Sequence, residues 1–405
     1  MNFLDLVIII VVVEIGLILI VGLQRRSFPW FLTKQDELPV FDSQALQKFI
    51  NYSFDPYLGW VRRPDSSGIE NGKNGPIIFR INAEGSRAVS FETAEPVVAV
   101  FGDSYAFCRQ VEDNETFEAQ LSRLEGFGVL NFGVGNYGID QALLRYEHKD
   151  LPDTVKLVVM AFVPETICRI QSYWKHYLEF GNTFAFKPRF IVDSEGQLTL
   201  LENLMQNAED FATLHEKLPA LREADGFYEK KFRSHQFRFP YIASLMRHPL
   251  KQSMLIAAVG VRGLCRALGI SSQQVENLPF TLIMKSNLRD AYRLYYDSES
   301  IRLLSAILLR FKEGALRRGH IPLVVVMPQL LDLKLNKNKV APYQGFFSEL
   351  AQQLPVLDLT MKFMDSGFET LYINDQYGGH LSADGNRLVA KEISNWLKLN
   401  GKSVI

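Results

Sequence analysis

The sequence predicts an α/β fold in which helices cover both faces of a parallel β-sheet. Short apolar runs rich in β-branched residues alternate with longer stretches of helical periodicity, and this alternation is typical of a parallel sheet. The first such run, residues 97–101, ends directly at Gly102, where the chain is expected to turn sharply. The 405 residues are enough for a sizeable core in one large domain or two.

The expected elements follow in chain order. The lead-in before residue 96 is polar and turn-rich, with a short hairpin expected near residues 77–82. The expected strands of the sheet are residues 97–101, 128–132, 155–162, 321–327 and 356–359. The expected helices are residues 115–124, 140–149, 300–318, 343–353 and 383–399. Because the alternation stops for more than a hundred residues after residue 162, the sequence also predicts a large insertion.

These elements divide the chain into five segments. They are a transmembrane anchor at residues 1–26, a lead-in that packs on the core at 27–95, the two parts of the core at 96–169 and 299–405, and a mostly helical insertion at 170–298. We interpret the aromatic-rich insertion as a cap over the edge of the sheet at which a ligand would bind. A glycan- or acceptor-binding surface is an alternative, because sugars stack on aromatic rings. Residues 242–268 have helical periodicity but too short an apolar core for a second span, which leaves contact with a membrane surface as another alternative.

Charge and cysteine content argue against several classes of function. Lys and Arg total 44 against 45 Asp and Glu, so the overall charge does not favour a nucleic-acid partner. The three cysteines, Cys108, Cys168 and Cys265, lack metal-ligand spacing, and their odd number argues against a complete disulfide framework. We therefore expect buried free thiols that hold neither a disulfide framework nor a metal.

Residues 4–23 are almost continuously apolar and are interrupted by Asp5 and Glu14. Twenty such residues match the hydrocarbon core of a bilayer, and no basic start or cleavage site marks a secretory signal, so a retained single-pass anchor is expected. Glu14 at mid-span is costly unless it is protonated or paired with another helix, which leaves an oligomer through this helix open. Because positive side chains follow the span and none precedes it, the positive-inside rule favours a cytoplasmic location for the globular domain.

Two motifs near opposite ends of the chain carry the candidate chemistry. Gly102-Asp103-Ser104 places a serine hydroxyl at the carboxyl edge of the sheet, where open α/β folds bind their ligands. His380 lies just before the last expected helix. A serine and a histidine that meet on folding can act as nucleophile and general base, and this is the prediction for Ser104 and His380.

These motifs resemble those of the SGNH (GDSL-type) hydrolases, in particular membrane-anchored bacterial members. The resemblance extends over residues 55–170 and 300–400, and three further blocks contribute to it: residues 55–60, 81–87 and 131–138. It implies a flavodoxin-like three-layer α/β/α sandwich and a reaction without metal or organic cofactor. It also implies that Ser104 is both the nucleophile and, through its own backbone N–H, one oxyanion donor.

The family further implies a third catalytic residue and additional oxyanion donors. Its aspartate commonly lies three residues before the histidine, where this chain has Tyr377, so Asp375 is the candidate and Asp358 a second one. Without either, the site would be a Ser-His dyad. The backbone N–H of Asn136 takes the place of a glycine N–H as donor, and Thr166 stands where the family usually has an asparagine.

The resemblance implies a membrane-anchored serine acyl-ester hydrolase. The expected substrate is an acylated carbohydrate, and the expected activity is that of an O-acyl (O-acetyl) esterase with an acyl-serine intermediate. One alternative is a glycan O-acyltransferase that uses the same Ser-His pair with a sugar hydroxyl in place of water. Another is a catalytically degenerate protein that binds glycan or organises an assembly, which the missing asparagine favours.

Overall fold

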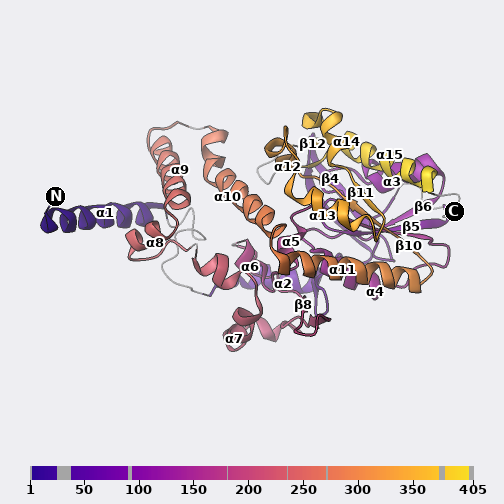
Figure 1. Ribbon diagram of the computed structural model, residues 1–405, viewed down its shortest axis with the longest axis horizontal. Coiled ribbons are helices and arrows are strands. Elements are labelled where there is room, and N and C mark those ends of the chain that lie inside the picture. The colour runs from indigo at the N-terminus through magenta and orange to yellow at the C-terminus, as the bar shows by residue number, and fades with distance from the viewer. Residues whose placement is uncertain are drawn as a thin grey trace.

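A five-stranded parallel sheet forms the centre of the main body of the molecule (Figure 1). The structure is a computed structural model, and it describes residues 2–24, 38–89, 94–179, 181–234, 236–270, 272–373 and 379–400. The strand order is β11 (Val356–Asp358), β10 (Ile321–Val326), β7 (Leu157–Phe162), β5 (Pro96–Gly102) and β6 (Gly128–Asn131), and all neighbours are parallel. Counted along the chain, this is the 2-1-3-4-5 order of flavodoxin-like sheets, so the predicted fold class is confirmed.

Helices cover both faces of the sheet because consecutive side chains of a strand point to opposite sides. On β5, Ala99 and Phe101 pack into one core, while Val98 and Val100 pack into the other. The first core is closed by α4 (Ile139–Glu147), α11 (Ser298–Arg317) and α13 (Pro342–Leu350), and the second by α3 (Phe117–Glu125) and α15 (Ala383–Asn400). A sheet covered on both faces has continuously apolar strands, which is the pattern that predicted them.

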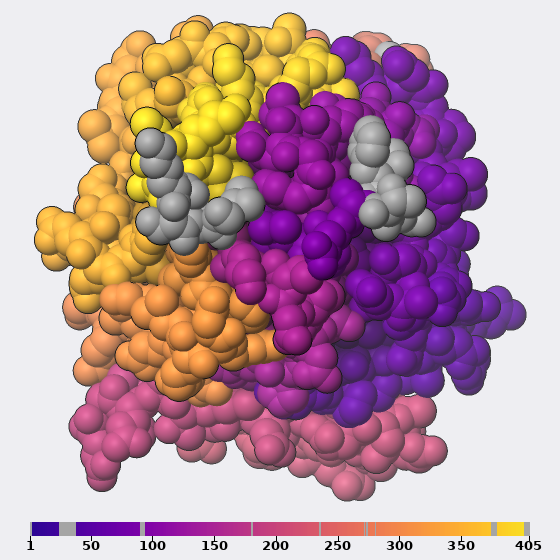
Figure 2. Space-filling view, turned by 90° about the vertical axis from the view of Figure 1, so that its right-hand side faces the viewer, coloured from indigo at the N-terminus to yellow at the C-terminus, as the bar shows by residue number. Residues whose placement is uncertain are grey.

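The last helix of the chain lies beside the helix that follows the first core strand. Figure 2 shows the C-terminal segment in yellow against the purple segment that includes α3, and α15 packs along α3. The chain segments that follow Ser104 and His380 therefore share one face of the sheet, although they are far apart in sequence.

The lead-in has more regular structure than the sequence predicted. It contains α2 (Ser43–Tyr52), β1 (Phe54–Asp55), β2 (Gly59–Trp60), β3 (Ser66–Gly72) and β4 (Gly75–Ile81). The hairpin predicted near residues 77–82 is formed by β3 and β4 and turns at residues 73–74, so its expected position was wrong. Phe54, Leu58 and Trp60 are buried in the α4 side of the core, which fastens the lead-in to the sheet.

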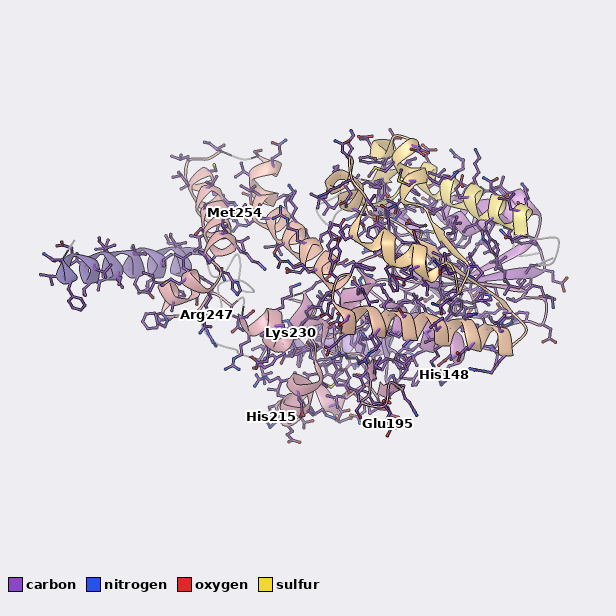
Figure 3. The ribbon with its side chains drawn as sticks, in the orientation of Figure 1. His148, Glu195, His215, Lys230, Arg247 and Met254 are labelled. Carbon is purple, nitrogen blue, oxygen red and sulfur yellow. The ribbon has the colours of Figure 1, made fainter. Side chains whose placement is uncertain are left out.

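The insertion is mostly helical, as expected. After α5 (Thr166–Arg169), which ends the first part of the core, its elements are α6 (Lys175–Leu178), β8 (Arg189–Val192), β9 (Leu198–Leu201), the 3₁₀ turn Glu209–Phe211, α7 (Leu214–Ala224), a π-helical turn (Tyr228–Arg233), α8 (Tyr241–Arg247), α9 (Pro249–Ala267) and α10 (Gln273–Leu294). The periodic stretch 242–268 is two helices, because Pro249 lacks the N–H that would continue α8 and instead opens α9. Lys230, Arg247 and Met254 mark the course of this segment away from the sheet (Figure 3).

Shorter elements complete the core. They are α12 (Leu330–Leu335), α14 (Thr360–Asp365), β12 (Tyr372–Ile373), β13 (His380–Leu381) and the 3₁₀ turns Asp113–Glu115 and Phe368–Thr370. The three cysteines are free thiols. Cys108 and Cys168 are buried as expected, whereas Cys265 is partly exposed, so the expectation of burial was wrong for Cys265.

Helix α1 (Phe3–Gln24) projects from one end of the molecule (Figure 1). By length and composition it is able to cross a membrane, and most of its side chains are exposed. Leu17 and Val21 pack against the helices of the insertion. Glu14 accepts hydrogen bonds from the backbone N–H groups of Tyr241 and Ile242 at 2.7 and 2.8 Å. The carboxylate is therefore bonded within its own chain, and its burial does not require a second copy.

Candidate active site

Ser104 lies at the point where the chain leaves the carboxyl end of β5. The order of the sheet places β6 on one side of β5 and β7 on the other, so this end of β5 is the topological switch point at which such sheets bind ligands. The turn requires glycine at position 102, because a Cβ there would lie 1.8 Å from the carbonyl oxygen of Ala161. The Asp103 carboxylate accepts the N–H of Tyr105 at 2.8 Å and fixes the turn.

The fold brings His380 to Ser104. The imidazole Nε2 lies 3.0 Å from the Ser104 Oγ, across 276 residues of sequence. The short strand β13 carries His380 and pairs with β12. Tyr105 positions the residue that precedes β13, because its hydroxyl donates to the carbonyl oxygen of Gly379 at 2.7 Å. The centre of its ring lies 5.1 Å from that of the His380 imidazole. Tyr105 follows the serine directly, and no sequence signal had assigned it this positioning contact.

The other imidazole nitrogen of His380 has no hydrogen-bond partner among the described residues. Asp375, the expected third member, lies in the segment 374–378, outside the described residues. Asp358, the second candidate, accepts hydrogen bonds from the N–H and the hydroxyl of Thr360 at 2.9 and 2.6 Å. These contacts hold the first residue of α14 in place, and no described contact joins Asp358 to His380.

The charge state of His380 suits a general base. Burial lowers the pKa of His380 to about 3, and the positive charges of Arg109 and Arg169 lower it as well. The imidazole is therefore neutral near pH 7 and able to accept the serine proton. A carboxylate at Nδ1 would raise this pKa by stabilising the imidazolium, which brings a base closer to its working pH.

Two backbone N–H groups are available as oxyanion donors. Asn136 has a φ of 69°, in the left-handed region that asparagine tolerates. Its loop is held by the indole of Trp60, which donates to the carbonyl oxygen of Gly135 at 3.0 Å. Within the described part of the chain, neither the Asn136 N–H nor the Ser104 N–H donates a hydrogen bond. Both predicted donors thus have the free N–H that the role requires.

Thr166 has a different contact from the one expected of an oxyanion donor. Its side chain is fully buried, and its Oγ1 accepts the N–H of Ile139 at 2.9 Å. This bond holds the first turn of α4 against α5. No described contact joins the Thr166 hydroxyl to Ser104, and its donor role stays a prediction.

A buried arginine, which sequence reasoning did not single out, joins three parts of the site. Arg169 Nη1 lies 3.1 Å from both the Asp103 carboxylate and the carbonyl oxygen of Tyr137, and its Nη2 lies 3.1 Å from the Glu165 carboxylate. Asp103 also accepts the N–H of Val163 at 3.1 Å. Arg169 therefore links the ends of β5 and β7 to the Asn136 loop. The i, i+4 spacing of Glu165 and Arg169 was the available signal.

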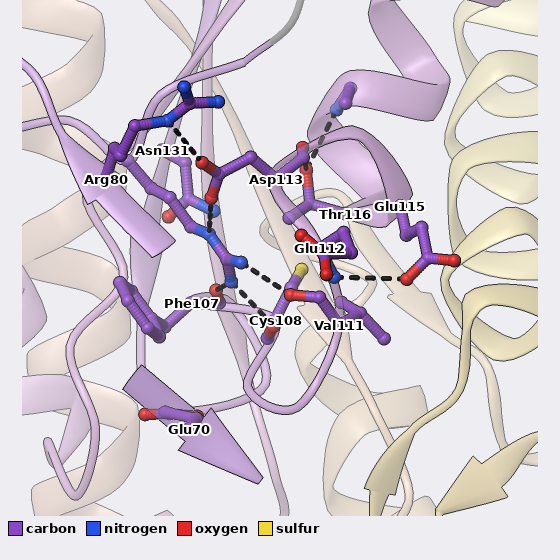
Figure 4. A network of polar contacts seen from close by, with 12 residues as sticks. Glu70, Arg80, Phe107, Cys108, Val111, Glu112, Asp113, Glu115, Thr116 and Asn131 are labelled. Atoms are coloured by element: carbon purple, nitrogen blue, oxygen red, sulfur yellow. Dashed lines mark hydrogen bonds and ion pairs between the residues drawn. The ribbon is translucent and has the colours of Figure 1, made fainter. Parts of the chain in front are cut away.

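A second buried arginine clamps the loop that follows Ser104 (Figure 4). Arg87 Nε pairs with Asp113 at 2.9 Å. The Arg87 Nη atoms donate to the carbonyl oxygens of Phe107, Cys108 and Val111 at 2.6–2.7 Å. The block 81–87 had contributed to the family resemblance, and the structure shows what its last residue does.

No cluster of three metal-ligating side chains occurs among the residues that the structure describes. No family model matches the chain, and no curated protein matches it. Among the described residues, the candidate site consists of Ser104 and His380 at the switch point of a flavodoxin-like sheet. Three solved structures to which this chain is similar are described next.

A lipolytic G-D-S-L family protein from Desulfitobacterium hafniense is 11% identical, with 74% of this chain and 99% of that chain covered and a TM-score of 0.33. A family member from Veillonella parvula is 8% identical, with coverages of 74% and 97% and a TM-score of 0.35. A phospholipase A1 from Streptomyces albidoflavus is 10% identical, with coverages of 75% and 99% and a TM-score of 0.34. Two of these carry the family name that the motifs resemble.

Proposed function

We propose that this protein is a serine acyl-ester hydrolase that uses Ser104 as nucleophile and His380 as general base. The observation that carries the proposal is the 3.0 Å contact between His380 Nε2 and Ser104 Oγ at the switch point of the sheet. A histidine within hydrogen-bond reach of a serine is the geometry that activates a hydroxyl for attack.

The described residues supply each step of acyl transfer. Ser104 Oγ attacks the acyl carbon while His380 takes its proton, and the N–H groups of Ser104 and Asn136 donate to the oxyanion. His380 then returns the proton to the leaving alkoxide, which leaves an acyl-serine. Water, deprotonated by the same imidazole, releases the acid and restores Ser104.

The proposed substrate is an O-acylated, and in particular O-acetylated, carbohydrate. The proposed alternative is transfer of the acyl group from Ser104 to a sugar hydroxyl, with His380 taking the proton of that hydroxyl in place of a proton of water. Hydrolysis and transfer are distinguished by incubating the full-length protein, in detergent, with an aryl acetate in the presence and in the absence of a sugar. A hydrolase releases acetate at a rate independent of added sugar, and a transferase acetylates the sugar and turns over faster with it. Absence of turnover by folded protein would leave the binding role.

We further propose that α1 anchors the protein in a membrane by a single span, with the catalytic domain in the cytoplasm. The apolar exposed surface of α1 supports the anchor, and the excess of positive charge after the span supports the side. A Glu349→Cys variant in sealed right-side-out vesicles is expected to resist an impermeant maleimide until the vesicles are lysed. Labelling of intact vesicles would reverse the proposed side.

Asp375→Asn is expected to lower kcat/KM by about 10²–10⁴-fold if Asp375 bonds His380 Nδ1. A carboxylate bonded to Nδ1 would raise the pKa of His380, so its loss would lower that pKa and move the acid limb of the pH–rate profile to lower pH. The control is Asp365→Asn, which removes an exposed carboxylate at the last residue of α14. An unchanged rate and acid limb in Asp375→Asn would assign the site to a Ser-His dyad.

A further inference from the structure

The insertion contacts α1 inside its apolar run and not only at its end. The face of α1 that carries Glu14, Leu17 and Val21 meets α8 and α9, where Leu17 and Val21 are buried with four side chains of the insertion. These four are Phe237, Tyr241, Leu255 and Val259. Because the spacing of the three α1 residues is i, i+3 and i+7, one continuous stripe of the helix forms the contact.

The position of Glu14 sets the depth of this contact. Residues 4–23 form the apolar run, and a helix rises about 1.5 Å per residue, so Glu14 lies about 13 Å inside the run from its end at Leu23. Glu14 accepts the N–H groups of Tyr241 and Ile242, so the first turn of α8 lies at this same depth. If α1 spans a bilayer with a core of about 30 Å, α8 begins well within the hydrocarbon.

The outward face of α9 is apolar. Leu250, Met254, Val261 and Leu264 are 46–79% exposed, and they recur at spacings of four, seven and three residues along one side of the helix. Phe239 and Met246 continue the exposed apolar surface next to α8. The opposite side of α9 is buried through Leu255 and Val259. The exposed apolar side of α9 has no protein over it among the described residues, and such a face is typical of a helix that contacts a membrane.

Figure 1 shows how these helices are placed. α9 runs across the direction of α1 rather than along it, and α8 lies beside the same end of α1. If α1 follows the membrane normal, α9 lies along the membrane plane, which is the orientation of an interfacial amphipathic helix. Arg247 and Met254 mark this region in Figure 3, on the α1 side of the molecule and away from the sheet.

The charge of the segment matches an anionic surface. Residues 230–275 contain eight Lys and Arg and no Asp or Glu. The flanking Glu229 and Glu276 pair with Arg233 and Arg266, so residues 229–276 carry a formal charge of +6, although the whole chain has a formal charge of only −1. Basic residues beside an apolar helix face are attracted to the head groups of anionic lipids. A second copy of this segment would carry the same positive charge and would repel it.

From the depth, the exposed apolar face and the charge, we infer that α8 and α9 form a platform embedded in the anionic leaflet next to the catalytic domain. The inference rests on the proposed membrane anchoring by α1. Its occupant is the lipid bilayer itself, which covers the face formed by Leu250, Met254, Val261 and Leu264. This part of the insertion is thus a membrane contact and not a cap over Ser104. Helix α10 connects it to the core, where it contacts α5 next to the site.

The test uses full-length protein in vesicles with a nitroxide spin label at one position at a time. The labelled variants are Met254→Cys and Val261→Cys on α9, Val11→Cys on α1 and Glu349→Cys on the catalytic domain, each with Cys265→Ser. Collision with oxygen relative to a water-soluble nickel complex reports lipid exposure. We expect the α9 ratios to exceed that at Glu349 by about fivefold or more. We also expect them to be higher in vesicles containing phosphatidylglycerol than in pure phosphatidylcholine.

The α1 label separates failure of the platform from failure of the anchor. A lipid-exposed Val11 label with water-exposed α9 labels overturns the platform and leaves the anchor standing, whereas a water-exposed Val11 label overturns both. Spin–spin broadening between α9 labels, with low collision of both reagents, would show a second copy on this face and overturn the lipid assignment. Equal ratios in the two lipid mixtures would overturn the role of the positive charge.

Discussion

Ser104→Ala and His380→Ala are each expected to abolish labelling by a fluorophosphonate and to lower ester turnover by about 10³-fold or more. In the proposed reaction the hydroxyl forms the covalent bond, and the imidazole 3.0 Å away removes its proton. Because the two groups act on one step, the double variant should lose little beyond either single variant. Gel fluorescence and kcat/KM for an aryl acetate measure the effect.

Matched controls exist on the surface of the same protein. Ser366→Ala and His215→Ala remove an exposed serine and an exposed histidine, and both variants should label like the wild type. A wild-type protein that is folded but does not label, beside a serine esterase that does, would count against catalysis. Labelling that survives in Ser104→Ala would place the nucleophile elsewhere.

Arg87→Met is expected to destabilise the fold by about 3–5 kcal/mol, because it leaves the buried Asp113 carboxylate without its buried partner. It also removes the donors to the carbonyl oxygens of Phe107, Cys108 and Val111. These carbonyls belong to the loop after Ser104, so the surviving folded protein should label more slowly with the fluorophosphonate. The free energy of unfolding in urea measures the first effect.

Arg80→Met is the matched control, because Arg80 bonds the other oxygen of the same carboxylate at 3.2 Å but is 70% exposed in its side chain. Exposed ion pairs contribute little, so the loss should stay below about 1 kcal/mol. Equal losses in the two variants would show that burial does not govern the strength of this network. A stable Arg87→Met protein with normal labelling would show that the clamp is dispensable for the site.

Most of the sheet was predictable because its strands are buried on both faces. Residues 97–101, 155–162 and 321–327 appear as almost entirely apolar runs for that reason, with Lys156 the one charged residue among them, and each lies within about two residues of its observed strand. The hairpin of the lead-in was misplaced, because its first strand β3 has a single large apolar residue, Ile69, and only the apolar residues of β4 gave a signal. Helix α10 was not predicted, because Pro279 and a mixed pattern obscure its periodicity.

The candidate site was only partly predictable. Ser104 and His380 stood in recognisable motifs, whereas Tyr105 and Arg169 act through contacts with residues distant in sequence. Arg87 was part of a recognised block, but a side chain that bonds carbonyl oxygens leaves no pattern in the residues that supply them. Thr166 was chosen by alignment with the family, and its buried hydroxyl instead bonds the start of α4.

By itself the sequence determined the order of strands and helices along the chain, the candidate nucleophile and base, and an apolar segment long enough to cross a membrane. These features are local in the chain, since strand burial, a sharp turn and hydrophobic length each show in consecutive residues. Only the tertiary structure decided that Ser104 and His380 meet, that Arg87 and Arg169 brace the loops around them, and that Glu14 bonds α8. Such contacts join residues far apart in sequence, and packing of the two cores and the insertion fixes their distances.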